Sequence, residues 1–162
     1  MDAYTCIVSK RDTRAYADKP IPPEALRRIL QAGRMAGSAK NTQPWRFVLL
    51  EEQAKKEELA ACGQFSAYIP SAAVVVAIVM PKPGREFDAG RCAQNMMLAA
   101  HADGIASCPV SMQDQECTRR VLGLPEEHSV PIVIAFGYPP AAPRAPGVPR
   151  VPLDELVHRG GW

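Results

Sequence analysis

Apolar residues recur along the chain at two kinds of spacing, and the two kinds follow one another in no regular order. Repeats every three or four residues predict helices over residues 2–9, 22–37, 53–62, 88–103 and 114–122. Short apolar runs predict strands over residues 47–50, 72–80, 105–112 and 130–136. Because these elements form no regular βαβ repeat, the pattern favours the α+β class.

Three of these elements contain apolar side chains that we expect to be buried. The run 72–80 predicts a strand that is buried on both faces. Helix 88–103 is apolar on nearly every side, which predicts burial in its own domain or in a dimer interface. The first helix can be capped by Asp2, and we expect its Tyr4, Ile7 and Val8 to point inward.

Proline is concentrated in the last third of a chain whose 162 residues suit one domain. Six of the sixteen prolines lie between residues 138 and 152, where they disfavour helix and sheet and favour an extended arm. A linker would need a further domain, and only about ten residues follow residue 152. We therefore expect residues 1–162 to form a single domain whose arm, residues 138–152, packs on a partner subunit.

Charge and cysteine content narrow the class of protein. With 19 Lys and Arg against 17 Asp and Glu, no overall field favours nucleic acid or anionic lipid. The five cysteines form no CxxC pair, so we interpret them as reduced core residues. The N-terminus resembles no signal peptide and the longest apolar run is too short for a membrane span, which predicts a soluble cytoplasmic protein.

The common catalytic and nucleotide-binding motifs are missing from the sequence. Neither GxGxxG nor GxxxxGK occurs, the serine elbow G-x-S-x-G is absent, and His101, His128 and His158 have no metal-ligand spacing. A chain without an evident acid, base, metal or nucleophile is expected where a bound cofactor carries the reaction.

Three features could hold a phosphorylated, planar cofactor. Lys10, Arg11 and Arg14 offer charge-assisted donors to a phosphate, although alone they also fit a solvated basic turn. The small residues of loop 37–43 would let a ligand reach its backbone N–H groups and the Asn41 amide. The same residues also fit an ordinary loop between a helix and a strand. Arg150 follows the proline arm and would carry no weight alone.

Taken together and in order, these features resemble the nitroreductase superfamily of FMN-dependent oxidoreductases. The resemblance rests on five motifs: Lys10-Arg11-Asp12-Thr13-Arg14, Pro20-Ile21-Pro22, Ser38-x-x-Asn41-x-Gln43-Pro44-Trp45-Arg46-Phe47, Gly104-Ile105-Ala106-Ser107-Cys108-Pro109-Val110-Ser111 and Gly137-Tyr138-Pro139. It implies a mixed, mostly antiparallel sheet flanked by helices, in an intertwined homodimer with two FMN sites at the interface.

The resemblance also assigns roles to individual residues. It places Lys10, Arg11 and Arg150 at the FMN phosphate, Arg14 near the flavin N1 and C2 carbonyl, and the backbone of Pro109, Val110 and Ser111 near N5. It draws Gly37, Ser38, Ala39 and Asn41 from the partner chain and includes Asp12 and Thr13 in the cofactor-binding segment. No residue is assigned as catalytic, because the flavin carries the chemistry while Arg14 and Ser111 tune it.

The implied activity is reduction of nitroaromatics, quinones or similar electron-poor small molecules by NAD(P)H, with hydride transfer through flavin N5. Alternatives are an FMN-binding module for storage or sensing, a flavin-fragmenting enzyme like the dimethylbenzimidazole synthases, and a structural dimer without flavin. Asp12 and Ser111 motivate the second alternative.

Two departures from the family are Gly37, where proline is common, and Asp12, where a small hydroxyl residue is frequent. The link 81–87 is also too short for the helical lid of larger members.

Overall fold

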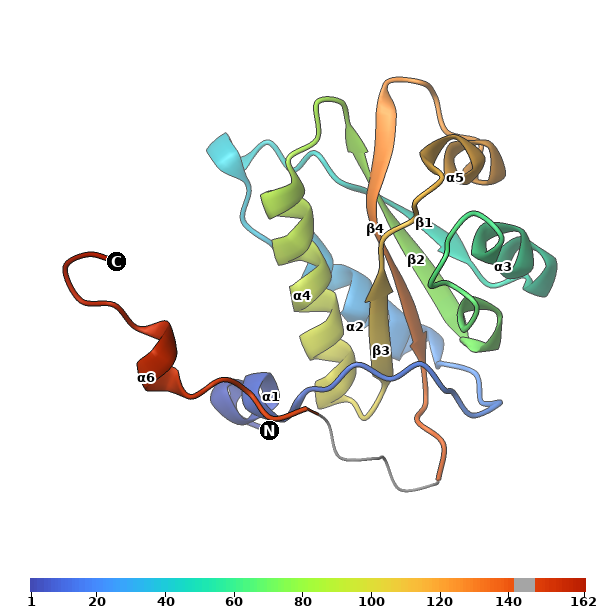
Figure 1. Cartoon of the computed structure of the whole chain (residues 1–162). Helices are drawn as coiled ribbons and strands as arrows, with labels where there is room; N and C mark the ends of the chain where they lie inside the picture. The colour runs from blue at the N-terminus through green and yellow to red at the C-terminus, as the bar shows by residue number, and fades with distance from the viewer. Residues whose placement is uncertain (142–147) are drawn as a thin grey trace.

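A four-stranded antiparallel sheet organises the chain, of which the computed structural model describes residues 1–141 and 148–162 (Figure 1). The strand order is β1-β2-β4-β3, with β1 at Arg46–Leu50, β2 at Val74–Pro81, β3 at Ala106–Val110 and β4 at His128–Gly137. The helices are α1 (Ala3–Ser9), α2 (Pro23–Arg34), α3 (Gln53–Ala60), α4 (Glu86–Ala102), α5 (Gln115–Leu122) and α6 (Leu153–Leu156), with 3-10 turns η1 (Ala39–Asn41) and η2 (Ile69–Ser71). Apart from the short α6 and the two turns, each of these elements confirms a predicted one.

Helices cover both faces of the sheet and enclose a core on each. Alternate residues of β2, among them Val76 and Ile78, pack toward α2 and α4, while Val75 and Ala77 pack toward α3 and α5. This confirms that the strand is buried on both faces. The described strand pairings are antiparallel, and a parallel bridge between Asp12 and Ser107 makes the sheet mixed, as the resemblance to the nitroreductase superfamily implied.

Helices α2 and α4 cross closely because Gly33 has no side chain. A Cβ at Gly33 would lie 2.8 Å from Met96 Cγ and 3.2 Å from Cys92 Sγ. Gly33→Ala is therefore expected to lower the free energy of unfolding by about 1–3 kcal/mol, measured by urea denaturation. Gly90→Ala is the control, because a Cβ there meets nothing within 4 Å and gains only helix propensity. Equal stability of the two variants would contradict the close packing.

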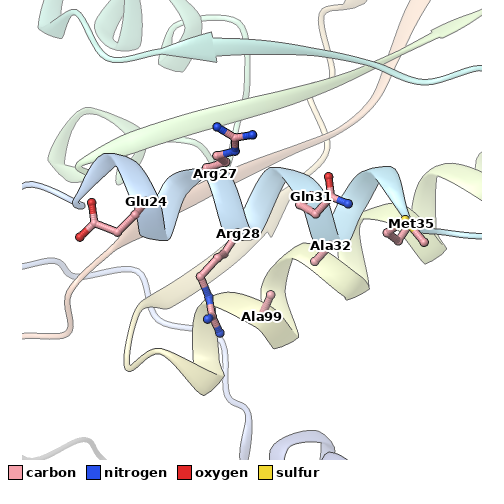
Figure 2. Close-up of a pocket in the computed structure, with 7 residues that line it drawn as sticks. All are labelled: Glu24, Arg27, Arg28, Gln31, Ala32, Met35 and Ala99. Atoms are coloured by element: carbon pink, nitrogen blue, oxygen red, sulfur yellow. The ribbon is translucent and has the colours of Figure 1, made fainter.

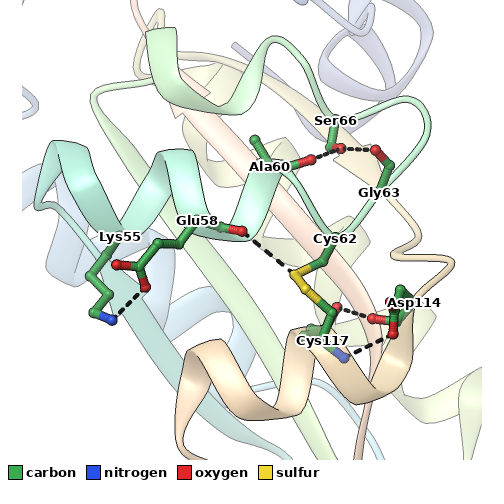
Figure 3. Close-up of a disulfide and its surroundings, with 9 residues drawn as sticks. Lys55, Glu58, Ala60, Cys62, Gly63, Ser66, Asp114 and Cys117 are labelled. Atoms are coloured by element: carbon green, nitrogen blue, oxygen red, sulfur yellow. Dashed lines mark hydrogen bonds and ion pairs between the residues drawn. A yellow bond between two sulfur atoms is a disulfide. The ribbon is translucent and has the colours of Figure 1, made fainter.

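Two cysteines depart from the predicted reduced state. Cys62, just after α3, and Cys117, on α5, form a disulfide with their Cα atoms 5.5 Å apart (Figure 3). The prediction was wrong for this pair because 55 residues separate them and only tertiary packing brings them together. Cys6, Cys92 and Cys108 are free and buried, as predicted, and burial raises the pKa of Cys92 to about 12.

The two ends of the chain leave apolar side chains in solvent. In α1 the cap by Asp2 is confirmed, but Tyr4, Ile7 and Val8 are exposed and only Cys6 is buried, so their predicted inward orientation is wrong within one chain. Residues 148–162 project away from the sheet, with Val151, Leu153 and Leu156 exposed. Part of the predicted arm, residues 142–147, lies outside the described residues. Within the described part of the chain, no helix has the length and apolarity to cross a membrane.

Candidate functional site

The basic segment 10–14 runs along the outer edge of β3. Thr13 N–H donates to the Ser107 carbonyl at 3.0 Å, beside the parallel bridge from Asp12 to Ser107. Since β3 is the last strand of the sheet, this segment covers an edge that would otherwise leave backbone groups unpaired. The structure thus brings two of the sequence motifs together, 10–14 and 104–111.

The side chains of Lys10 and Arg11, which the resemblance assigns to the FMN phosphate, make different contacts. The Lys10 ammonium forms an ion pair with Asp12 and lies 3.5 Å from Met97 Sδ on α4. Its side chain is 10% exposed, whereas that of Asp12 is 51% exposed. Arg11 Nη1 instead donates to the Val8 and Lys10 carbonyls at 2.7 and 2.8 Å, at the C-terminal end of α1, where a cation is favourable.

Arg14 lies against two residues that sequence reasoning did not select. Its guanidinium carbon is 5.9 Å from the centre of the Tyr68 ring, within the range of a cation–π contact. Contact with Cys108, and then with Tyr68, raises the pKa of Arg14 above its ordinary value. The Tyr68 hydroxyl donates to the Pro109 carbonyl at 3.3 Å. Arg14 is thereby linked to the strand end that carries Pro109, Val110 and Ser111.

The far end of β3 opens into solvent. Val110 is buried, whereas Ser111 is exposed and borders a hollow of about 530 Å³ between the start of α4 and the start of β4. Gln115 and Ser129 also line this hollow. On the same strand, the Ser107 hydroxyl is buried and has no hydrogen-bond partner among the described residues. An unsatisfied buried hydroxyl costs free energy and marks a place where a ligand atom could pair.

Loop 37–43 has a strained backbone. Lys40, Asn41 and Gln43 adopt positive φ angles of 53°, 53° and 47°, which non-glycine residues seldom do. Internal and neighbouring contacts hold the loop: Gln43 N–H donates to Ser38 Oγ at 2.9 Å, and Ala39 N–H donates to Asp88 Oδ2 at 3.3 Å. Strain of this kind is concentrated at functional sites.

Gly37 makes room for an arginine of α4. A Cβ at this position would lie 2.9 Å from the guanidinium carbon of Arg91. The glycine that replaces the family's common proline therefore lets Arg91 approach the loop backbone.

The loop and the basic segment contact opposite halves of α4. Loop 37–43 contacts Asp88 and Arg91, whereas Lys10 contacts Met97. Asp88 and Met97 are nine positions apart along the helix, which corresponds to a rise of about 14 Å. No hydrogen bond between described residues joins the two segments within one chain. Arg150 is exposed on the C-terminal arm, and no hydrogen bond or ion pair between described residues joins it to either segment.

A separate hollow of about 790 Å³ lies on the outer side of α2 (Figure 2). Glu24, Arg28, Gln31 and Met35 of α2 and Ala99 of α4 are among the residues that line it. It contains none of the predicted site residues. The candidate site is therefore the region of segment 10–14 and β3.

Comparison with known proteins accounts for the way these motifs come together. The model of the nitroreductase family matches residues 7–80 and 81–138. The chain belongs to the nitroreductase family. This confirms the resemblance found in the sequence, while the roles of the individual site residues stay predictions.

Relatives and solved structures in this family match nearly the whole chain. An NADH dehydrogenase of Thermus thermophilus is 30% identical over 97% of this chain and 95% of its own length. A nitroreductase of Desulfovibrio desulfuricans, solved in complex with FMN, is 28% identical and covers 100% of this chain and 99% of its own, with a TM-score of 0.88. The NADPH:FMN oxidoreductase of Vibrio harveyi, solved with NAD+, is 26% identical with a TM-score of 0.87, covering 98% of this chain and 77% of its own. These matches confirm the nitroreductase fold.

Sequence reasoning missed Tyr68 and did not single out Ser107 and Cys108 within their motif. Tyr68 lies in a stretch between α3 and β2 that has no clear periodicity, so no local signal marked it. The alternation along β3 could have indicated that Ser107 shares a face with Pro109.

Proposed function

We propose that the protein is an FMN-dependent oxidoreductase that uses NAD(P)H to reduce nitroaromatics, quinones or similar electron-poor small molecules. The observation that carries this proposal is the position of Arg14 and Lys10 in the segment that covers the outer edge of β3, within a nitroreductase fold. Relatives support the cofactor and the co-substrate, since one is solved with FMN and another is an NADPH-flavin oxidoreductase of Vibrio harveyi, 28% identical.

The residues present fit FMN chemically. The phosphate needs cationic donors, which Lys10, Arg11 and Arg150 would supply, and Lys10 would then exchange part of its contact with Asp12 for the phosphate. Ser107 offers a buried hydroxyl without a partner beside the same segment. When bound, FMN would supply hydride and electron transfer between NAD(P)H and the acceptor.

The chain's own groups would tune that chemistry from two sides. Arg14 would hold a positive charge near the flavin N1 and C2 carbonyl, where a fixed charge favours the reduced cofactor. The backbone of Pro109, Val110 and Ser111 would lie near N5 and orient the ring. Ser111, exposed beside the hollow at the strand end, would face the incoming substrate.

A homodimer with two interfacial sites completes this proposal. Within one chain, loop 37–43 is separated from segment 10–14, so Gly37, Ser38, Ala39 and Asn41 would serve the site of a second copy. Tyr4 and Ile7 on α1 and Leu153 and Leu156 near the C-terminus expose apolar surface that a partner would cover. The arm 138–152 would carry Arg150 onto that partner.

The proposal is tested by titrating the purified protein with FMN and recording its absorbance before and after anaerobic addition of NADH or NADPH. We expect FMN to bind, to bleach with one of the two nucleotides and to regain its colour with a quinone or nitrofurazone. Sedimentation should give the mass of a dimer. Failure to bind FMN would refute the proposal. Binding without turnover would favour a storage or sensing module, and loss of intact flavin would favour the flavin-fragmenting alternative.

A further inference from the structure

Tyr68 contacts both parts of the candidate site that would face the flavin. The centre of its ring lies 5.9 Å from the Arg14 guanidinium carbon, and its hydroxyl donates to the Pro109 carbonyl at 3.3 Å. Arg14 comes from the segment beside β3, while Pro109 belongs to β3 itself. One side chain therefore fixes the position of the cation relative to the strand end.

The loop that carries Tyr68 is itself held rigidly. Ser66 Oγ donates to the Ala60 and Gly63 carbonyls at 2.6 and 2.8 Å (Figure 3). Ile69, directly after Tyr68, is fully buried. The Cys62–Cys117 disulfide attaches the start of the loop to α5. Asp114 N–H also donates to the Cys62 carbonyl at 3.1 Å, which joins the loop to the turn after β3.

We propose that Tyr68 is a positioning residue that holds the Arg14 guanidinium in place against the end of β3. The inference rests on the proposed function, because Arg14 is there assigned to the flavin. A held guanidinium stabilises developing negative charge better than one that must be ordered during the reaction. Burial and contact with Cys108 raise the pKa of Tyr68, so the phenol stays neutral and keeps its donor.

The experiment measures the dissociation constants of oxidised and reduced FMN for the wild-type protein, Tyr68→Leu and Tyr68→Phe. Tyr68→Leu is expected to weaken binding of reduced FMN by about three- to tenfold more than that of oxidised FMN, because it removes the cation–π contact. A tenfold change in that ratio lowers the two-electron reduction potential by about 30 mV. Tyr68→Phe keeps the ring and should recover at least half of the shift.

A thermodynamic cycle with Arg14 shows whether Tyr68 acts through it. In an Arg14→Ala background, Tyr68→Leu should no longer change the ratio of the two dissociation constants. Tyr138→Leu is the matched control, since the Tyr138 ring also lies under a cation, the Lys19 ammonium at 3.9 Å from the ring centre, and Lys19 is not assigned to the flavin. It should leave the ratio unchanged.

Three results would overturn the inference while leaving the function intact. They are an unchanged ratio in Tyr68→Leu, an equal shift in Tyr68→Phe, and a shift that persists without Arg14. If Tyr68 had a purely structural role, Tyr68→Leu would weaken the binding of oxidised and reduced FMN equally and give the first result. If Tyr68→Leu does not fold, Tyr68→Met replaces it under the same criteria. Failure of the proposed function is distinguishable, because the wild-type protein would then not bind FMN at all.

Discussion

Replacing Arg14 with alanine is expected to lower kcat/KM for NAD(P)H oxidation by about 10²–10³-fold, the usual loss when a donor that stabilises developing charge is removed. The side chain lies against Tyr68 and Cys108 in the structure, so its charge is held in a defined place. Its removal should destabilise reduced FMN more than oxidised FMN. Steady-state kinetics with a quinone acceptor, together with the reduction potential, measure both effects.

Two further variants test whether the effect depends on the planar geometry of Arg14 and on its position in the site. Arg14→Lys keeps a cation but loses the planar fork, so we expect it to recover part of the activity. Lys19→Ala is the matched control, because Lys19 Nζ also lies over a tyrosine ring, that of Tyr138 at 3.9 Å, but outside the candidate site. An Arg14→Ala protein with wild-type kcat/KM and potential would exclude Arg14 from the site.

The fold could be predicted from sequence wherever a local pattern decides the structure. Asp114 caps α5 by accepting from Cys117 N–H at 2.8 Å, and Gly123 ends that helix in the left-handed region, with φ at 64°. Both signals are visible in the sequence alone. The orientation of Tyr4, Ile7 and Val8 was not predictable, because apolar periodicity identifies an apolar face but does not show whether another part of the same chain packs on it.

The candidate site was predictable in its segments and not in its contacts. Lys10 to Arg14 and Pro109 to Ser111 were selected as separate motifs, and the structure places them along one strand edge. The ion pair of Lys10 with Asp12 and the use of Arg11 at the end of α1 depend on side-chain directions that residue order does not specify. Tyr68 could be identified only from the packing of the loop between α3 and β2, and the sequence contains no local signal for that packing.

Removing the Cys62–Cys117 disulfide should have the largest effect on stability. A cross-link between residues 55 apart restricts the unfolded chain by about 4 kcal/mol in the chain-entropy description. That is a large share of the roughly 5–15 kcal/mol by which a domain is usually stable. We expect the Cys62→Ala, Cys117→Ala double variant to unfold at correspondingly lower urea, with the free energy of unfolding read from the denaturation curve.

The thiol count shows which state of the bond is being measured. Of the five cysteines, Cys6, Cys92 and Cys108 are free, so unfolded wild-type protein should react as three thiols before reduction and as five after it. Dithiothreitol should lower the stability of the wild-type protein and leave that of the double variant unchanged. Five thiols before reduction, or equal stability of oxidised and reduced protein, would contradict the prediction. Because Cys62 begins the loop that carries Tyr68, we also expect the double variant to bind FMN more weakly. Weaker binding would show that the disulfide supports the geometry of the site as well as the stability of the fold.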